Sequence, residues 1–213
     1  MQITNNVLTG SIFMKKILLM TFFTLAGAMG FAGESRALTP YIGLDYMYSD
    51  YGFDFGKNQD GRWLEHKFNG GAASLGVKLT NNLAFEGFYQ LTENGHSYTS
   101  NFITAGDRLE TKMRLRAYGV DLVRDIVNMD VLEILGSIGV AKYEMDSTRK
   151  YTLGGVTERE KINKDFEALR LGVGAQLNIT PHYSIRGMFR YSLTNITEID
   201  DIKEFTIGAR VYF

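Results

Sequence analysis

The last residues of the chain, TIGARVYF (206–213), alternate strictly between two kinds of side chain. Successive side chains of an extended chain point to opposite faces. One face is apolar and consists of Ile207, Ala209, Val211 and Phe213. The other face combines small, polar and aromatic side chains and includes Arg210. This pattern predicts a β-strand that lies between two different environments.

The same period-two alternation recurs along the chain and predicts eight strands in total. Six of them are regular and cover 41–48, 73–79, 83–91, 169–177, 185–193 and 204–213. The other two, 112–123 and 131–145, are less regular. In the first, the apolar positions change parity after Ala117, which predicts a β-bulge near Tyr118–Gly119. In the second, Leu135 falls on the polar face and Lys142 on the apolar face, which leaves the ends of this strand open.

The connections between these strands alternate between short and long. The short ones lie at 80–82, 123–131 and 178–182, the long polar ones at 49–67, 92–110 and 144–165, and one of moderate length at 194–202. This alternation predicts an antiparallel up-and-down arrangement, with short turns at one end and long loops at the other.

Eight amphipathic strands fit a soluble barrel or sandwich with its apolar face inside, or a transmembrane barrel with its apolar face toward lipid. The polar face carries many glycines, which weaken an exposed strand but leave room for arginines inside a narrow barrel. The strands also reach roughly nine to eleven residues, the length of a tilted membrane-spanning strand. The sequence therefore predicts an all-β fold, an eight-stranded antiparallel up-and-down transmembrane β-barrel with short periplasmic turns and long extracellular loops.

The charged residues of the polar face are predicted to form a network in the lumen. They are Asp45, Lys78, Glu86, Arg114, Arg116, Glu133, Arg170, Arg186, Arg190, Glu204 and Arg210. Because an eight-stranded barrel is just wide enough for side chains to fill, these residues are expected to plug it structurally. The alternative is a narrow small-solute or anion channel. If Lys112 is included, basic residues outnumber carboxylates eight to four, so either Asp121 or loop carboxylates fold in, or water and anions remain inside.

Residues 1–37 are predicted to precede the barrel domain, which covers 38–213. From Met14, two lysines precede the apolar stretch Ile17–Ala28, and small residues follow, as in a secretory signal peptide. Cleavage fits at several sites, the last of them after Ala37. The apolar stretch is shorter than the ~20 residues of a membrane-spanning helix. The residues before Met14 do not resemble the start of a signal peptide, so Met14 is the better candidate for the translation start.

Composition narrows the classes of function. The chain has no cysteine, which excludes disulfides, thiol chemistry and cysteine-based metal sites. Its net charge is −1, so the sequence predicts no nucleic-acid partner, which normally needs a concentrated basic face. The histidines, His66, His96 and His182, fall in different loops or turns, so neither a metal cluster nor a cofactor is predicted.

In its strand number and terminal pattern, the chain resembles the small eight-stranded outer-membrane barrels, the family of the OmpA membrane domain, OmpX and the opacity-type surface proteins. The resemblance covers about residues 39–213. It implies location in the outer membrane of a Gram-negative bacterium and contact with membrane lipid and lipopolysaccharide. It does not imply the peptidoglycan-binding activity that OmpA carries in a second domain.

The C-terminal strand is predicted to have two roles. It closes the barrel by pairing with the first strand, so that no strand edge is left open in the membrane. In this family, a terminal aromatic residue after alternating apolar residues is the signal for the outer-membrane assembly machinery. The matching residues here are Phe205, Ile207, Ala209, Val211 and Phe213.

Aromatic residues also fit the two membrane interfaces expected of such a barrel. If both termini are periplasmic, the residues near the outer interface are Tyr46, Tyr48, Tyr89 and Tyr191, and those near the inner interface are Phe85, Tyr183 and Phe213.

No catalytic residue is predicted. Some small outer-membrane barrels are lipid A acyl hydrolases with a His-x-Ser pattern on a strand, but in GHSYTS (95–100) the third residue is Tyr98 and the stretch falls in a predicted loop. The long loops could hold an extracellular ligand, and the first of them contains the only tryptophan, Trp63. The predicted function is a structural or surface-interaction role, adhesin-like and non-catalytic, with the acyl hydrolase as a remote alternative.

Overall fold

The computed structural model describes residues 38–53, 66–93, 95–100, 108–153, 156–196 and 199–213. The predicted signal peptide within 1–37 and the loop residue Trp63 lie outside these residues. In the described ranges, no helix has the length and apolar character needed to cross a membrane.

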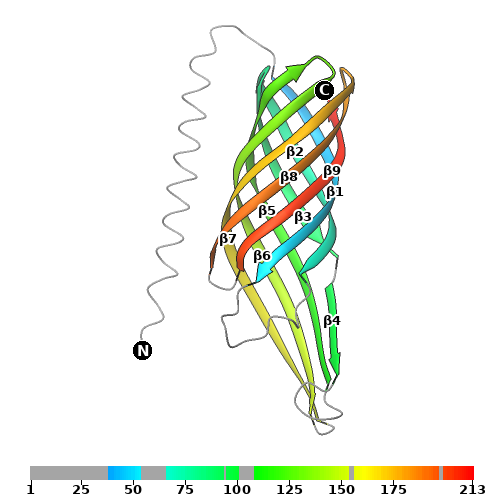
Figure 1. The fold of residues 1–213 in the computed structure, drawn as a ribbon, viewed down its shortest axis with the longest axis vertical. Helices are drawn as coiled ribbons and strands as arrows, with labels where there is room; N and C mark the ends of the chain where they lie inside the picture. The colour runs from blue at the N-terminus through cyan, green and yellow to red at the C-terminus, as the bar shows by residue number, and fades with distance from the viewer. Residues whose placement is uncertain (1–37, 54–65, 94, 101–107, 154–155, 197–198) are drawn as a thin grey trace. The chain divides into compact units, whose positions relative to one another are not determined.

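The described part of the chain forms one antiparallel sheet of nine strands, which closes into a barrel (Figure 1). The strands are β1 Thr39–Phe53, β2 Lys67–Thr80, β3 Leu83–Thr92, β4 Gly95–Ser100, β5 Arg108–Met129, β6 Leu132–Leu153, β7 Val156–Thr180, β8 Tyr183–Ile196 and β9 Ile199–Tyr212. Since β3 and β4 pair with successive parts of β5, they share one place, and the ring has eight positions. The predicted fold class is confirmed.

The last strand closes the barrel against the first, as predicted. β1 pairs with β9 from Tyr41 opposite Tyr212 to Gly52 opposite Asp201. The backbone N–H of Phe213 donates to the carbonyl oxygen of Pro40 at 3.0 Å. Closure satisfies the backbone polar groups that would otherwise face lipid without a partner.

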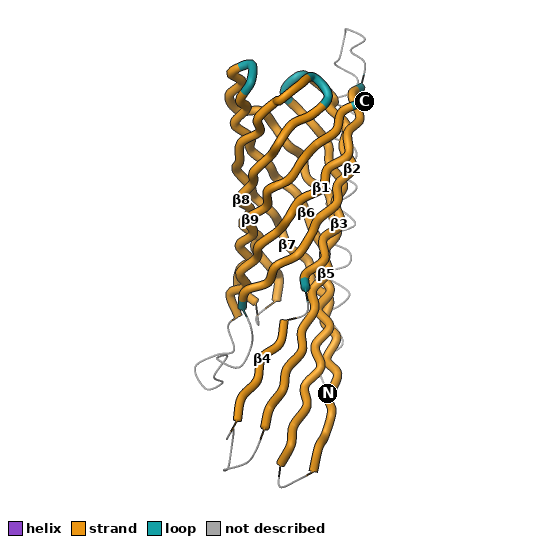
Figure 2. The backbone as a smooth tube through the Cα atoms, turned by 90° about the vertical axis from the view of Figure 1, so that its right-hand side faces the viewer, coloured by secondary structure: helices purple, strands orange, loops and turns teal. Residues whose placement is uncertain are grey.

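Short turns join the strands at the end of the barrel where the C-terminus lies (Figure 2). The hydroxyl oxygens of Thr80 and Thr180 accept hydrogen bonds from backbone N–H groups two residues on, at 3.3 and 3.2 Å. In the third turn Asp130 has φ 58, a left-handed conformation that Asp tolerates, and its N–H donates to the side chain of Asn128 at 3.0 Å. These turns lie where the sequence predicted short connections.

At the other end, β4 and the adjoining parts of β5, β6 and β7 project beyond the rest of the barrel as a four-stranded sheet, here called the extension (Figure 2). It contains 95–100, 108–116, 144–153 and 156–166. The prediction of long loops at 92–110 and 144–165 was therefore wrong for most of these residues, and GHSYTS forms β4. These strands were not predicted from the sequence because most outward positions of the extension are charged or polar, which weakens the alternation of apolar and polar residues.

The predicted bulge in the β5 segment is absent from its described pairings. Odd-numbered residues from Leu109 to Val123 face the interior throughout, and the pairings of Tyr118 and Gly119 run without a register shift. The shift lies further on, between Asp125 and Val127.

What changes along β5 is the medium outside the barrel. Near the extension, Leu115 is buried inside and Arg116 faces out, whereas further along Asp121 is inside and Val120 faces out. The outer surface is thus polar where it meets water and apolar where it meets lipid. The same switch explains β6, where Leu135 is buried inside and Lys142 lies on the outer surface.

Candidate functional site

A buried charge network fills the middle of the lumen, with Glu86 of β3 at its centre. Glu86 is 1% exposed. Its Oε2 accepts hydrogen bonds from Arg186 Nη1 at 2.7 Å and from the Tyr41 hydroxyl at 2.9 Å. Arg210 Nε and Arg190 Nη2 lie 3.8 and 3.9 Å from the two carboxylate oxygens of Glu86. Three guanidinium groups from β8 and β9 therefore share one carboxylate from β3.

A second centre lies around Arg170 of β7. Its Nη2 is 3.1 Å from Glu204 Oε2, and its Nη1 is 3.7 Å from Asp121 Oδ2. Arg190 Nε is 3.3 Å from the same Asp121 oxygen, so Arg190 joins the two centres. The guanidinium of Arg170 also lies 3.8 Å from the centre of the Phe88 ring, where the ring's negative face attracts a cation.

Arg210 is held by a bidentate pair with Asp45. Nη1 and Nη2 of Arg210 donate to Oδ1 and Oδ2 of Asp45 at 2.8 and 2.9 Å, the geometry that favours arginine over lysine. Gly43 leaves the space for this arginine, because a Cβ there would lie 2.6 Å from Arg210 Cζ and 2.4 Å from Ser74 Oγ.

Two predicted members of the network do not lie in the lumen. Arg114 is exposed on the outer surface. Arg116 also faces outward, where its Nη2 is 2.7 Å from Asp146 Oδ2 and 3.6 Å from Glu144 Oε2. The prediction was wrong because the polar face of β5 is its outer face near the extension. Because of the predicted bulge, Asp121 was also left out of the predicted network. Asp121 is 1% exposed, and the uninterrupted alternation of β5 places it inside.

With these corrections, basic residues no longer outnumber carboxylates in the described lumen. The basic residues are Lys78, Arg170, Arg186, Arg190 and Arg210, and the acidic residues are Asp45, Glu86, Asp121, Asp125, Glu133 and Glu204. Charges taken out of water need such partners. The basic excess inferred from the sequence does not exist among these residues, and the expectation of an anion-selective lumen loses its basis.

Lys78 and Glu133 lie near the short turns. They are joined to the main network by Gln176, whose amide oxygen accepts a hydrogen bond from Arg186 Nε at 3.0 Å. Lys78 Nζ is 3.7 Å from Glu133 Oε1. The side-chain amides of Gln176 and Asn178 each donate to Glu133 at 2.9 Å. Neither amide was among the predicted site residues, although Gln176 alternates in phase with Arg170 on the same strand.

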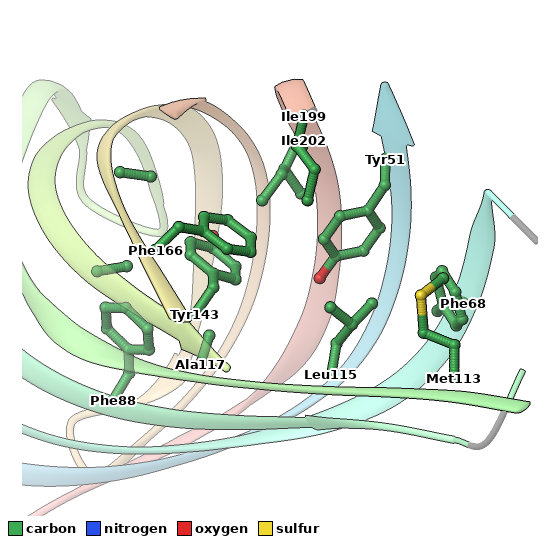
Figure 3. Close-up of a cluster of buried hydrophobic side chains, with 12 residues drawn as sticks. Tyr51, Phe68, Phe88, Met113, Leu115, Ala117, Tyr143, Phe166, Ile199 and Ile202 are labelled. Atoms are coloured by element: carbon green, nitrogen blue, oxygen red, sulfur yellow. The ribbon is translucent and has the colours of Figure 1, made fainter. Parts of the chain in front are cut away.

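Apolar side chains pack on both sides of the charge network. Toward the extension lies a cluster of Tyr51, Phe68, Phe88, Met113, Leu115, Ala117, Ala141, Tyr143, Phe166, Ala168, Ile199 and Ile202, whose side chains point into the interior (Figure 3). Toward the short turns lies a second cluster of Tyr41, Ala84, Val123, Leu135, Met188 and Tyr212. The charge network is thus enclosed between two apolar layers.

The outer face of the extension carries a basic patch near its far end, made of Arg108, Lys112, Lys150, Arg159 and Lys161. Lys150 lies directly between Glu110 and Arg159 across three strands, and Thr148 lies between Lys112 and Lys161 in the same way. Glu110 is the acidic residue within the patch, with its carboxylate 3.3 Å from Lys150 Nζ and 3.4 Å from Lys112 Nζ. The hydrogen bond from Lys150 lowers the pKa of Glu110 below its ordinary value.

The predicted assembly-signal residues share the outer face of β9. They are Phe205, Ile207, Ala209, Val211 and Phe213, and Phe213 is 67% exposed. Their side chains point away from the lumen, toward the position of lipid.

The remaining candidates do not assemble into a reactive site among the described residues. No group of three or more His, Asp or Glu side chains there is arranged to hold a metal ion. His96 and Ser97 are neighbours on β4, so their side chains point to opposite faces of the extension. That placement does not pair Ser97 with His96 as nucleophile and base.

The chain matches a family model described as the outer membrane protein beta-barrel domain over residues 18–213. A comparison with curated proteins gave no match. Three solved structures each align over their whole length with 84% of this chain. Ail, the attachment invasion locus protein of Yersinia pestis, is 17% identical with a TM-score of 0.55. Neisserial surface protein A is 16% identical with a TM-score of 0.56, and a major outer membrane protein of Thermus thermophilus is 10% identical with a TM-score of 0.58.

A second structure of Ail, in complex with the heparin analogue sucrose octasulfate, is 15% identical to this chain with a TM-score of 0.53. At such identities the likeness shows the fold, while function must be argued from the site.

Proposed function

The chain belongs to the outer-membrane β-barrel domain family, and from that premise we propose that it is a non-catalytic, adhesin-like surface protein whose extension binds sulfated polyanions. The barrel lies in the outer membrane. In this class of protein the short turns face the periplasm and the long connections face outward, so the extension projects from the cell. The proposal includes a secretory signal peptide within residues 1–37.

The basic patch is the observation that carries the proposal. Its five cations are set against one carboxylate, that of Glu110. Among the described residues, Arg108, Arg159 and Lys161 make no ion pair. Strands lie about 4.8 Å apart and same-face residues roughly 7 Å apart along a strand, so the patch is a two-dimensional array of cations. Such an array suits a flexible chain with many sulfate groups better than a single small anion.

The complex of Ail with sucrose octasulfate supports the choice of ligand class, because it pairs a sulfated ligand with a barrel of the same fold. The array of cations on this chain supports the same ligand class independently of the shared fold.

The packed lumen favours a surface role over the channel alternative. Ion pairs such as Glu86–Arg186 lie between two layers of buried apolar side chains. The acyl hydrolase alternative is disfavoured because His96 and Ser97 point to opposite faces of β4.

The test is the affinity of the protein, held in lipid nanodiscs, for immobilised heparin. We expect Arg159→Gln combined with Lys161→Gln to weaken binding about tenfold at physiological salt, since each exposed charge pair contributes roughly 0.2–1 kcal/mol. The matched control is Lys67→Gln combined with Lys203→Gln, which removes the same charge from exposed positions on β2 and β9. Equal weakening by both double variants, or no binding by the wild type, would exclude the patch as the site.

A further inference from the structure

A groove on the outer wall of the barrel follows β2. Its floor is small, because Gly71 and Ala73 are consecutive outward residues of this strand. Larger residues of the neighbouring strands form its two sides. They are Tyr46 and Leu91, paired with Gly71, and Leu44 and Tyr89, paired with Ala73. The groove has a volume of about 780 Å³, within the roughly 300–1,000 Å³ typical of ligand sites.

The floor of this groove lies open and one side is fixed. A Cβ added to Gly71 would meet only the backbone oxygen of Asp45, at an ordinary 3.7 Å. The hydroxyl of Tyr46 donates to Asn69 Oδ1 of β2 at 2.7 Å, which fixes the position of that ring. The rings of Tyr46 and Tyr89 belong to residues 55% and 49% exposed, so both walls remain accessible from the membrane.

The groove has a polar end and an apolar end. Toward the membrane centre, the small floor ends at Leu75, the next outward residue of β2. Toward the extension, Arg114 and Glu93 line the groove. Arg114 makes no ion pair or hydrogen bond within the part of the chain that the structure describes. A charged end toward the outside and an apolar end toward the membrane centre match the orientation of a lipid in the outer leaflet.

We propose that this groove binds one acyl chain of lipid A, with a phosphate of the lipid A headgroup at Arg114. The apolar walls and the glycine floor accept the chain through van der Waals contacts, and because the surrounding lipid is equally apolar, the charged end supplies the preference for lipid A. The unpaired guanidinium supplies the charge-assisted hydrogen bonds that a phosphate prefers. Glu93 opposes the phosphate, so its charge weakens the site. The groove lies on the barrel wall, with Arg114 at the base of the extension, and its proposed role does not depend on polyanion binding by the basic patch.

The first test fills the floor of the groove. The protein is reconstituted in vesicles of lipid A, phosphatidylethanolamine and phosphatidylglycerol, extracted in mild detergent, and examined by native mass spectrometry for retained lipid. We expect the wild type to retain lipid A and Gly71→Leu to retain at least about tenfold less, because the leucine side chain would occupy the floor that the acyl chain contacts. The matched control is Gly187→Leu on β8, where an added Cβ would also meet only one backbone oxygen, at 3.9 Å. It should retain lipid A as the wild type does.

The second test changes the charged end and does not depend on how well Gly71→Leu folds. Arg114→Gln should reduce retention of lipid A roughly threefold to tenfold, and Glu93→Gln should increase it. Each variant is first shown to be folded by its faster gel migration before boiling. Retention of lipid A by Gly71→Leu at the wild-type level would overturn the proposal. So would an unchanged Arg114→Gln, or equal retention of phosphatidylglycerol by the wild type.

Discussion

Arg186 Nη1 on β8 and Glu86 Oε2 on β3 lie 2.7 Å apart, although 100 residues separate them in the sequence. The two strands are four places apart in either direction around the ring of eight, so the pair spans the lumen from one wall to the opposite one. An ion pair in this position ties the two walls together and occupies the centre of the path through the barrel.

Replacing Glu86 by Gln should destabilise the barrel substantially. The change leaves Arg186, Arg190 and Arg210 with one carboxylate fewer in a buried setting. We expect unfolding in urea to show a loss of about 2–4 kcal/mol, between the cost of an unsatisfied buried polar group and that of a broken buried ion pair. The control is Glu144→Gln, which removes an outward-facing, partly exposed partner of Arg116 and should cost less than about 1 kcal/mol.

The same variant tests whether the lumen is closed. A wild type with a packed lumen should pass little current in a planar bilayer, and Glu86→Gln should open more often because a central contact is lost. Steady conduction by the wild type, with an unchanged free energy of unfolding in Glu86→Gln, would support a channel instead.

Tyr143 tests the apolar layer on the extension side. Its ring stacks on Phe166 with centroids 5.2 Å apart and planes 6° apart, and its hydroxyl lies 3.1 Å from Ser192 Oγ. Tyr143→Ala should lower the free energy of unfolding by about 3–5 kcal/mol, as expected for truncation of a buried aromatic side chain. Tyr118→Ala is the matched control, because that ring lies on the outer surface and is 41% exposed. A similar loss for both variants would argue against a packed interior at this level.

Phe213→Ala tests the terminal assembly signal without removing the backbone hydrogen bond that Phe213 makes to Pro40. We expect secretion to continue and insertion into the outer membrane to slow, which pulse–chase labelling and gel migration before boiling would measure. Phe189→Ala, at another outward and partly exposed phenylalanine, should insert at the wild-type rate. Equal rates for all three proteins would show that Phe213 is not part of a signal.

Binding of polyanions should depend on pH through Glu110. Since Lys150 lowers the pKa of Glu110, its carboxylate stays charged at neutral pH and is neutralised only as pH falls below the ordinary value of 4.5. Below that pH the basic patch loses its acidic member, so affinity for dextran sulfate should rise. Glu110→Gln should raise affinity already at pH 7, by roughly twofold to fivefold. The control Glu133→Gln, at a buried residue of the lumen, should leave this affinity unchanged.

The period-two pattern was sufficient to predict the barrel, the three short turns and the pairing of β1 with β9. It succeeded because lipid on one side and a crowded lumen on the other impose opposite demands on alternate residues. The pattern also identified most of the lumen charges, since Glu86, Arg170, Arg186, Arg190, Glu204 and Arg210 alternate with apolar residues within the membrane. It failed on β5, where the polar face moves to the outside at Arg114 and Arg116.

By itself, the sequence determined the fold class and the face of each membrane-spanning strand, because local alternation records what each side chain meets. Only the tertiary structure decided which charges meet across the lumen, since Glu86 and Arg186 are brought together by ring closure and not by spacing. Only the tertiary structure showed that β5–β7 continue into an extension, whose outer face is polar because it stands in water. The inward side of β5 never changes. The medium outside β5 changes from lipid to water, and the residue pattern of a single strand does not show where the membrane ends.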